Sequence, residues 1–584
     1  MIRRNCWRHS VFLQGSRYKL ARSIRNHTAS SFNPITAVPP ASLDSPSQKL
    51  PPNRKWRKRL FWVSASLGAL YTFDYVSLDQ AIVRNLRCIL TLSIIAADYK
   101  LNFEEGKDIK ALHTRTANRV YDLIEANGGL YIKIGQAIAM QASVLPPVFQ
   151  QKFAKLFDMA PQDSWHEIEK VFISDFGKSP DEVFESIEHR AIASASVAQV
   201  HKAKLKTGEW VAVKIQHPSI EKQMHWDLGA YRAMMYIYDK LLFDIPVYFT
   251  VNFTCNRLLA EANFEREAKN SELLNEKLQN EPLLKDQVYI PKVYHDFTSK
   301  RVLTVEWIDG TSLSNREELE RKRFSKKKIM NTMVNLFAAQ IFSWGVVHCD
   351  PHPGNQIVRY VNGGRQQLVL IDHGLYVYEP DKFRLEYCKL WKSMFMLKDE
   401  EIKKIALSWG IGSPQMFASS VMLRPYHSTK IGKSNSSEDD LSSLHKDFEQ
   451  QSKMNETFRQ FIQDTTKMPL ELIFLGRNMR IVQGCNQLLG SPVNRIKILA
   501  NWASRSLATS VPDMTFKQKI SAWTDHFTFL IIVALSDVGF WITRVRQLVL
   551  GTNGQGFEDL IERQVRETAK QQFGLEIEKG AFEA

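Results

Sequence analysis

The spacing of apolar and polar positions divides the chain after residue 77 into three regions. From 78 to 190, apolar residues recur every three or four positions, which is typical of amphipathic helices. Between about 191 and 310 the pattern changes to short alternating or β-branched runs, which predict strands. From Lys326 onward helical spacing returns. The pattern predicts an α+β fold with a helical extension at 77–190, a small strand-containing lobe at 191–310 and a large helical lobe at 311–584.

The small lobe is predicted mainly from two strand-like runs, Glu209–Ile215 and Val302–Trp307. One helix, around Asn256–Asn275, separates them along the chain. The large lobe contains a polar insert at 428–452 with too few apolar residues to form a core. At 584 residues, the chain is long enough for more than one folded unit.

The first 43 residues contain no Asp or Glu, and their arginines alternate with Ser, His and apolar residues such as Trp7 and Phe12. This acid-free basic pattern is typical of a mitochondrial presequence. A disordered basic tail is the alternative. The segment at 44–59 is rich in proline and in basic residues, which predicts a linker between the presequence and the folded chain.

A charge-free apolar stretch, Leu60–Phe73, follows a basic cluster at Arg54–Arg59. A bilayer-spanning helix needs about 20 residues, so the stretch is short, but basic and aromatic flanks can extend it. We predict a transmembrane segment at 60–76, with an interfacial anchor or a buried core helix as the alternatives. A second apolar run, Phe527–Thr543, contains Asp537 and predicts a buried core helix.

The net charge of +15 is concentrated at the N-terminus. Residues 1–60 hold thirteen Lys and Arg and one acid, so they carry +12 and the rest of the chain only +3. Because a nearly neutral body offers no phosphate-binding stripe, we expect no nucleic-acid partner. The six cysteines are scattered without ligand-like spacing, which predicts neither a metal–thiolate site nor a disulfide framework.

Three motifs carry nucleotide chemistry. The run Val211–Lys214 places a lysine on a predicted strand, where its ammonium can neutralise phosphates. Downstream, the loop H-C-D-P-H-P-G-N spaces Asp350 and Asn355 five residues apart, as in the catalytic loop of kinases. An apolar run then ends at Asp372, in the position of the metal-binding D-F-G motif. A strand lysine alone is often only a surface residue, but the order and spacing of all three motifs predict a kinase-like site.

The loop that would cover the phosphates carries alanines, Ala193, Ala195 and Ala198, where kinases carry glycines. Glycine allows positive φ and close backbone approach, whereas the Cβ of alanine resists both. We therefore expect the nucleotide to bind differently under this loop. Transfer of the γ-phosphate to a protein substrate is correspondingly disfavoured.

Together these motifs resemble those of the UbiB (ADCK) family of atypical kinases, which act in coenzyme Q biology. The resemblance covers roughly residues 110–400. It includes Lys133–Gln136, similar to the family's K-x-G-Q motif, and the segment Glu261–Asn270, in addition to the alanine loop, the V-A-V-K strand and the catalytic loop. The sequence D-H-G-L in place of D-F-G is similar to the branch that contains human ADCK one and fungal mitochondrial members. We expect His373 to pack where kinases carry phenylalanine.

The resemblance implies a role for each residue of the kinase-like site. Lys214 would pair with Glu267, which lies on a helix, and the alanine loop would cover a bound ATP or ADP. Asp350 would be the acid of the catalytic loop. Asn355 and Asp372 would hold Mg²⁺.

The resemblance also implies a regulatory extension that folds over the active site and obstructs a peptide substrate. Lys133, Gln136 and Glu261 would belong to it. The family's E-x-D motif reads Glu261-Ala-Asn263 here, so the third position has no negative charge. Because Asn263 cannot attract a cation as the family's aspartate would, we do not expect it to contact a metal ion or a lysine.

The function that the resemblance implies is ATP hydrolysis or atypical kinase activity at the mitochondrial inner membrane, in coenzyme Q or lipid homeostasis. The implied partner is a membrane lipid, either coenzyme Q or one of its precursors. Two alternatives stay open: a catalytically weak, nucleotide-dependent lipid-binding scaffold, and a true protein or small-molecule kinase. The basic cluster before the apolar stretch, with Asp74 and Asp79 after it, predicts that the bulk of the chain faces the intermembrane space.

Overall fold

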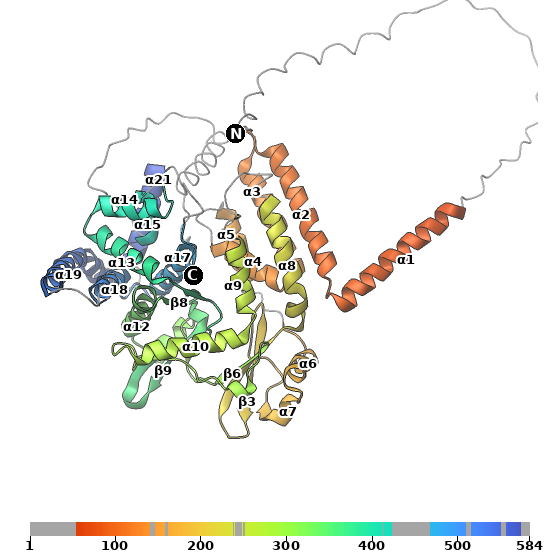
Figure 1. Ribbon diagram of the computed structural model, residues 1–584, viewed down its shortest axis with the longest axis horizontal. Helices are drawn as coiled ribbons and strands as arrows, with labels where there is room; N and C mark the ends of the chain where they lie inside the picture. The colour runs from red at the N-terminus through yellow and green to blue at the C-terminus, as the bar shows by residue number, and fades with distance from the viewer. Residues whose placement is uncertain are drawn as a thin grey trace, which may run out of the picture. The chain divides into compact units, whose positions relative to one another are not determined.

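The computed structural model describes residues 54–104, 106–140, 147–157, 162–237, 239, 248, 251–412, 414–422, 468–509, 516–550 and 556–573 (Figure 1). The predicted presequence, most of the predicted linker and the polar insert at 428–452 lie outside these residues. Contacts divide the chain into two units, Met1–Ser66 and Leu67–Ala584. Helix α1 (Arg54–Ser77) begins inside the predicted linker, because Lys and Arg are good helix formers.

Helices α2 to α5 precede the small lobe, and α8, from farther along the chain, packs against α2 and α4. The buried Arg84 on α2 pairs with the buried Asp227 on α8 and also donates to the carbonyl of Asn127. Gly128 and Gly129, both at positive φ, separate α3 from α4. The bounds are α2 Ala81–Asn102, α3 Ile109–Asn127, α4 Leu130–Met140, α5 Pro147–Phe153 and α8 Pro218–Ile237.

The small lobe contains a five-stranded antiparallel sheet of order β1-β3-β4-β6, in which β2 pairs with β3. Lys214 lies within β4, opposite Val200 on β3 and Leu303 on β6. The sheet begins at Phe184, earlier than the predicted boundary at 191, because a four-residue strand has too few positions to show its period. The bounds are α6 Trp165–Phe176, α7 Pro180–Val183, β1 Phe184–Ile187, β2 Ala193–Ser194, β3 Ala198–Leu205, β4 Trp210–Gln216 and β6 Val302–Glu306.

The single helix predicted around Asn256–Asn275 is two helices, α9 (Val251–Glu261) and α10 (Phe264–Gln279). Asn263 separates them, since its backbone is extended and its side-chain oxygen accepts from the backbone N–H of Glu265 at 3.1 Å. An N-cap of this kind stabilises a helix start by about 1 kcal/mol. The asparagine that departs from the family's E-x-D motif therefore fixes where α10 begins.

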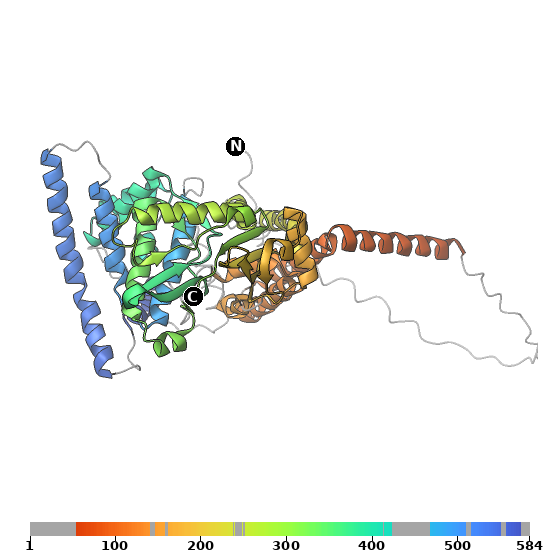
Figure 2. The same ribbon diagram turned by 90° about the horizontal axis from the view of Figure 1, so that it is seen from below.

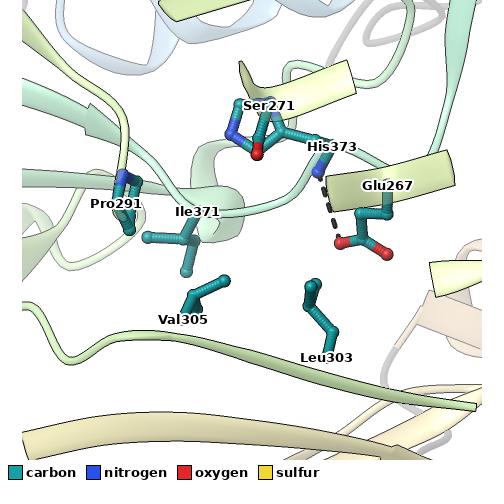
Figure 3. A pocket seen from close by; sticks show the side chains of 7 residues that line it. All are labelled: Glu267, Ser271, Pro291, Leu303, Val305, Ile371 and His373. Atoms are coloured by element: carbon teal, nitrogen blue, oxygen red, sulfur yellow. Dashed lines mark hydrogen bonds between the residues drawn. The ribbon is translucent and has the colours of Figure 1, made fainter. Parts of the chain in front are cut away.

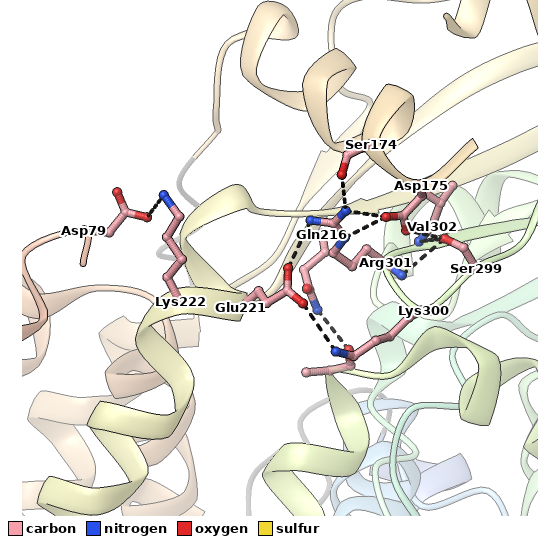
Figure 4. Close-up of polar contacts among 11 residues, drawn as sticks. Asp79, Ser174, Asp175, Gln216, Glu221, Lys222, Ser299, Lys300, Arg301 and Val302 are labelled. Atoms are coloured by element: carbon pink, nitrogen blue, oxygen red, sulfur yellow. Dashed lines mark hydrogen bonds and ion pairs between the residues drawn. The ribbon is translucent and has the colours of Figure 1, made fainter. Parts of the chain in front are cut away.

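Arg301, the residue before β6, joins the sheet to two helices (Figure 4). Its guanidinium donates to Asp175 on α6, with 2.9 Å between Nε and Oδ1, and to Glu221 on α8, with 3.1 Å between Nη1 and Oε2. The neighbouring Lys222 lies 3.5 Å from Asp79, which precedes α2. These contacts connect the helical extension to the edge of the sheet.

The large lobe is built around one extensive apolar core that includes the fully buried Phe342, Tyr387 and Trp391. A four-stranded sheet of order β5-β10-β9-β7 and the strand pair β8–β11 precede most of its helices. Its strands are β5 Val288–Tyr289, β7 Thr311–Ser312, β8 Val346–His348, β9 Gln356–Val361, β10 Arg365–Leu370 and β11 Tyr376–Tyr378. Its helices are α11 Arg316–Arg321, α12 Lys326–Ala339, α13 Asp381–Phe395, α14 Asp399–Ser408, α15 Pro414–Met422, α17 Glu471–Leu488, α18 Arg495–Thr509, α19 Phe516–Ser536, α20 Val538–Leu550 and α21 Phe557–Phe573.

The apolar run Phe527–Thr543 forms the end of α19 and the start of α20, and the prediction of a buried core helix is wrong for its outer face. Phe527 and Leu535 are 64% and 67% exposed. Among the described residues, His526–Val549 is long and apolar enough to cross a membrane by length and composition. Helices α1 and α2 together meet the same criteria as a pair bent by 109°.

Gly135 allows α4 to pack closely against the helices beside it, and we predict that Gly135→Ala lowers the free energy of unfolding by about 1–3 kcal/mol. A Cβ at this position would lie 2.4 Å from Leu156 and 2.8 Å from Ile124, whose side chains are both buried. Gly229→Ala on α8 is the matched control, because a Cβ there meets nothing within 4 Å. Denaturant unfolding should show the control unchanged or stabilised by about 0.5–1 kcal/mol. Equal effects of both changes would contradict the packing argument.

Candidate active site

Lys214, Glu267 and Asp372 form the centre of the candidate site. The Nζ of Lys214 donates to both carboxylate oxygens of Glu267, at 2.8 and 2.9 Å, and to Oδ1 of Asp372 at 3.3 Å. Strand β4 supplies the lysine, α10 the glutamate, and the segment after β10 the aspartate. The ion pair that the resemblance implied, Lys214 with Glu267, is thus in direct contact. The further contact of Lys214 with Asp372 joins the small lobe to the large lobe.

The charges in this cluster perturb one another. Burial raises the pKa of Glu267, and the negative charge of Asp372 adds to that effect, so that together they outweigh Lys214. Burial would also raise the pKa of Asp372, but the positive Lys214 and other cationic groups hold it well below its usual range. Asp372 is therefore ionised at neutral pH and can ligate a cation. Lys214 stays charged because the two carboxylates raise its pKa more than burial lowers it.

Asp350 lies in the loop after β8 and is held by a cation from the large lobe. Its Oδ2 is 3.0 Å from Nη2 of Arg477 on α17, and its buried Oδ1 has no hydrogen-bond partner within the described part of the chain. Burial alone would raise the pKa of Asp350, but the positive charges of Arg477 and Lys133 outweigh burial. The net effect is a lowered pKa, so the carboxylate is ionised. One oxygen of an ionised aspartate is thus left without a donor, as a residue that orients or deprotonates a nucleophile requires.

His348 connects the two aspartates through the backbone. Its Nδ1 accepts from the N–H of Asp350 at 2.9 Å, and its Nε2 donates to the carbonyl of Asp372 at 2.8 Å. Burial lowers the pKa of His348, which agrees with this neutral arrangement. Gln340, in a π-helical turn at Gln340–Trp344, accepts from the N–H of His348 at 2.8 Å. The catalytic loop and the D-H-G segment are therefore held in one network.

Asp372 and Asn355 are suited to hold Mg²⁺. The amide of Asn355 donates to Oδ2 of Asp372 at 3.0 Å, so both side chains can reach one ion once the amide turns its oxygen inward. Magnesium takes one or two protein oxygens and fills its other positions with phosphate and water. No group of three or more His, Cys, Asp and Glu that could hold a metal occurs among the described residues. The donor set therefore fits an ion that arrives with a nucleotide.

The helical extension reaches the site through Lys133. Its Nζ on α4 lies 3.3 Å from Oε2 of Glu261, the last residue of α9, and Glu261 raises the pKa of Lys133. Asp350 and Asp372 raise that pKa too, so the ammonium lies within the field of both catalytic carboxylates. Gln136, one turn later, instead donates to the carbonyl of Leu156 at 3.1 Å. Of the extension's residues, Lys133 and Glu261 are brought to the site, whereas Gln136 braces α4.

The three alanines of the covering loop have different environments. Ala193 and Ala195 are exposed, while Ala198 is buried in a cluster with Phe264. The loop closes where the N–H of Ala195 donates to the carbonyl of Ala198 at 2.8 Å. His217 lies 2.9 Å from the carbonyl of Ala195 and bonds to an aspartate on its other side. Ala193 and Ala195 are thus the members of the loop that a nucleotide can approach.

A small cavity lies between α10 and β6, and Glu267 is one of the residues that line it (Figure 3). His373 lies at its edge and donates its backbone N–H to Glu267 at 3.4 Å. The imidazole of His373 is buried, accepts from the hydroxyl of Tyr376 at 2.8 Å and donates to the carbonyl of Leu370 at 3.2 Å. The lining residues are Glu267, Ser271, Pro291, Leu303, Val305, Ile371 and His373.

Sequence reasoning missed the polar residues that the large lobe contributes. Arg477 is separated from Asp350 by more than a hundred residues, and its neighbour Asn478 donates to the carbonyl of His348 at 2.6 Å. Gln340 was also missed. The signal that Asn478 and Gln340 share is a polar residue at a buried position of an apolar helix, which is costly unless the side chain is paired. Arg477 is half-buried and gives no such signal.

Residues 155–406 match the family model of the ABC1 atypical kinase-like domain. An ABC1 family protein of Schizosaccharomyces pombe is 44% identical over 469 residues, which cover 80% of this chain and 87% of that protein. The chain belongs to the ABC1 family. An ABC1 family protein of Purpureocillium lilacinum is 36% identical over 554 residues, covering 88% of this chain and 91% of that protein. AarF domain-containing protein kinase 1 of Xenopus laevis is 32% identical over 364 residues, covering 61% of this chain and 69% of that protein.

This ABC1 chain has a kinase-like fold, with a strand-containing small lobe, a large helical lobe and a helical N-terminal extension. The family and the fold class predicted from the sequence are therefore confirmed. A solved structure, the Rv3197–erythromycin complex of Mycobacterium tuberculosis, aligns with a TM-score of 0.38 at 20% identity, covering 62% of this chain and 96% of that one.

We predict that His373 makes the ABC1 chain less stable as the pH falls. Burial lowers the pKa of His373 to about 3, so below its ordinary value of 6.5 the unfolded chain binds a proton that the folded chain does not. The resulting loss is about 1.4 kcal/mol per pH unit. In His373→Phe this loss is absent, so the difference in unfolding free energy between wild type and variant should change by about 2 kcal/mol between pH 6.5 and about pH 5. Parallel stability curves in denaturant titrations would show that His373 titrates normally.

Proposed function

We propose that the chain binds ATP or ADP with Mg²⁺ between its lobes and catalyses slow ATP hydrolysis or phosphoryl transfer. The observation that supports this most is the convergence of Lys214, Glu267 and Asp372 in one ion-pair cluster. Lys214 would meet the phosphates, and Asp372 with Asn355 would hold the ion that neutralises them. Asp350 would then orient or deprotonate the attacking hydroxyl or water.

Two features support restrained rather than general kinase activity. Lys133 and Arg477 both direct positive charge at Asp350, where an incoming nucleophile would bind. The covering loop carries Cβ atoms at Ala193 and Ala195, which limit how closely the backbone can approach a phosphate. A peptide acceptor would need the extension to move aside. Water or a small hydroxyl compound needs less room.

The proposed setting is the mitochondrial inner membrane, with the folded unit in the intermembrane space, and the proposed partner is a membrane lipid such as coenzyme Q or a precursor. The acid-free N-terminus and the apolar stretch at 60–76 support this setting. The family resemblance supports the lipid. A nucleotide-dependent lipid-binding scaffold and a true protein or small-molecule kinase stay as alternatives, and ATP turnover stimulated by lipid separates the first proposal from both.

Substitutions of Asp372 and Asp350 should have different effects, the first on nucleotide binding with Mg²⁺ and the second on ATP turnover. We expect Asp372→Asn to abolish the stabilisation by ATP that depends on Mg²⁺, which at a hundredfold excess over Kd is about 2.7 kcal/mol for the wild type. Asp350→Asn should keep that stabilisation and lose at least about a hundredfold in turnover, because it retains the metal ligands and lacks the base. Thermal shift and phosphate release measure the two effects. Wild-type hydrolysis by both variants would refute the proposed site.

The proposed topology predicts access from the intermembrane side. Protease added to mitochondria with a ruptured outer membrane and an intact inner membrane should digest the folded unit, because the basic flank at Arg54–Arg59 is retained in the matrix. Carbonate extraction should leave the chain in the membrane pellet. Protection of the folded unit would reverse the orientation, and release by carbonate would reduce the apolar stretch to a peripheral anchor.

A further inference from the structure

The outer face of α19 and α20 carries a continuous stripe of exposed apolar side chains. Its members recur every three or four residues, which keeps them on one side of the helical segment. The segment is the outermost helix of the large lobe, drawn in blue at the left of Figure 2. The stripe comprises Phe527, Leu530, Ile531, Leu535, Val538, Trp541, Ile542, Val545, Leu548 and Val549, all at least 36% exposed.

The opposite face of the same segment is fixed to the large lobe. Phe529 and Val533 are buried against Ala500 of α18, and Phe529 lies edge-to-face with Phe395 at 5.8 Å. Asp537, which lies between α19 and α20, is buried, and its Oδ2 lies 2.6 Å from Nζ of Lys497. These contacts hold the segment along the lobe and leave the stripe outside the core.

Positive charges border the stripe. Arg546 is exposed and Arg544 is half-buried, one on each side of Val545. Lys327, at the start of α12, is exposed and lies 5.8 Å from the ring centroid of Trp541. Since Lys497 neutralises Asp537, the described side chains around Trp541 present cationic groups next to a large apolar surface. Anionic lipid headgroups above acyl chains have the complementary chemistry.

We infer that α19 and α20 form a membrane-docking face that lies lengthwise in the headgroup layer of a bilayer containing anionic lipid. The stripe would enter the acyl boundary, Trp541 would sit at the interface, and Arg544, Arg546 and Lys327 would contact headgroups. This face is separate from the apolar stretch at 60–76. The inference depends neither on that stretch nor on nucleotide chemistry.

The contacts of the inner face argue for docking in the plane of the membrane rather than for a span. A transmembrane helix from His526 to Val549 would have to carry Asp537 away from Lys497 and Asn494, and would separate Phe529 and Val533 from Ala500 of the lobe. Because Asp537 is buried, separating it from Lys497 would leave a buried charge without its cation, which is strongly unfavourable. Docking through the stripe breaks none of these contacts.

The test places environment-sensitive fluorophores on the full chain reconstituted in vesicles. Leu535→Cys and Ile542→Cys report on the stripe, and Ile173→Cys on α6 is the control, being 41% exposed and on the small lobe. Labelling is selective in a Cys6→Ser background, because the five described cysteines are buried. The vesicles are phosphatidylcholine with or without cardiolipin, and nitroxide quenchers sit on lipids either near the headgroup or near the end of the acyl chain.

We expect both stripe reporters to shift to the blue and to be quenched at least twofold more than the control by lipid-borne nitroxide. Quenching should be stronger from the headgroup position than from the chain end, and cardiolipin should increase it. Arg544→Gln with Arg546→Gln should reduce the cardiolipin effect several-fold, since each basic residue contributes to binding of anionic lipid. Far-UV and thermal unfolding measurements verify that the variants are folded.

Three outcomes would overturn the inference. Quenching that is strongest from the chain end would mean that the segment spans the bilayer. Stripe reporters that neither shift to the blue nor are quenched by lipid-borne nitroxide would mean that the face stays in water. Disulfide crosslinks between Leu535→Cys chains that form without vesicles would mean that a second copy covers the stripe.

Discussion

The contact between Lys214 and Glu267, extended to Asp372, is the constraint on which the rest of the site depends. The lysine comes from the middle of a sheet, the glutamate from a helix whose start is set by Asn263, and the aspartate from the end of a strand in the other lobe. Glu267 is buried, whereas Lys214 and Asp372 are half-buried, and removing Lys214 would leave the buried carboxylate as an uncompensated charge. One group of charges therefore fixes the positions of the small-lobe sheet, helix α10 and the large lobe relative to one another.

A second layer of contacts controls access to that group. Arg477 holds one oxygen of Asp350, while Lys133 and Glu261 form a pair beside it. The cationic side chains of Arg477 and Lys133 would also attract a phosphate group. When a nucleotide binds, each could therefore pair with a phosphate in place of its present carboxylate partner. Under the proposed function, opening the site would mean moving Lys133, and with it α4, rather than rearranging the lobes. Gly135 matters for this reason, because it sets how closely α4 lies against its neighbours.

The residues of the site that could be predicted from sequence share one property: each belongs to a short motif. Spacing along the chain suffices for Asp350 and Asn355, because a few residues fix their geometry. Arg477 could not be found this way, since only tertiary packing brings α17 to the catalytic loop. The division between α9 and α10 could not be predicted from the apolar spacing either, because it depends on the N-cap that Asn263 forms. The apolar period of α19 predicted a helix correctly, but period alone does not distinguish a face that meets protein from one that is exposed.

The packing of the extension would connect a membrane contact at α2, as the proposed function has it, to the carboxylates of the candidate site. The outer side of α2 exposes apolar residues, among them Ile89, Leu90 and Ile94, while its inner side is tied to α8 by the buried pair of Arg84 and Asp227. Helix α8 packs in turn against α4, which carries Lys133. A bilayer that displaced α2 would have to move α8 as well, because separating a buried charge pair is more costly than shifting two packed helices together. Under the proposed function, a bilayer that moved α2 would therefore also move α4 and Lys133.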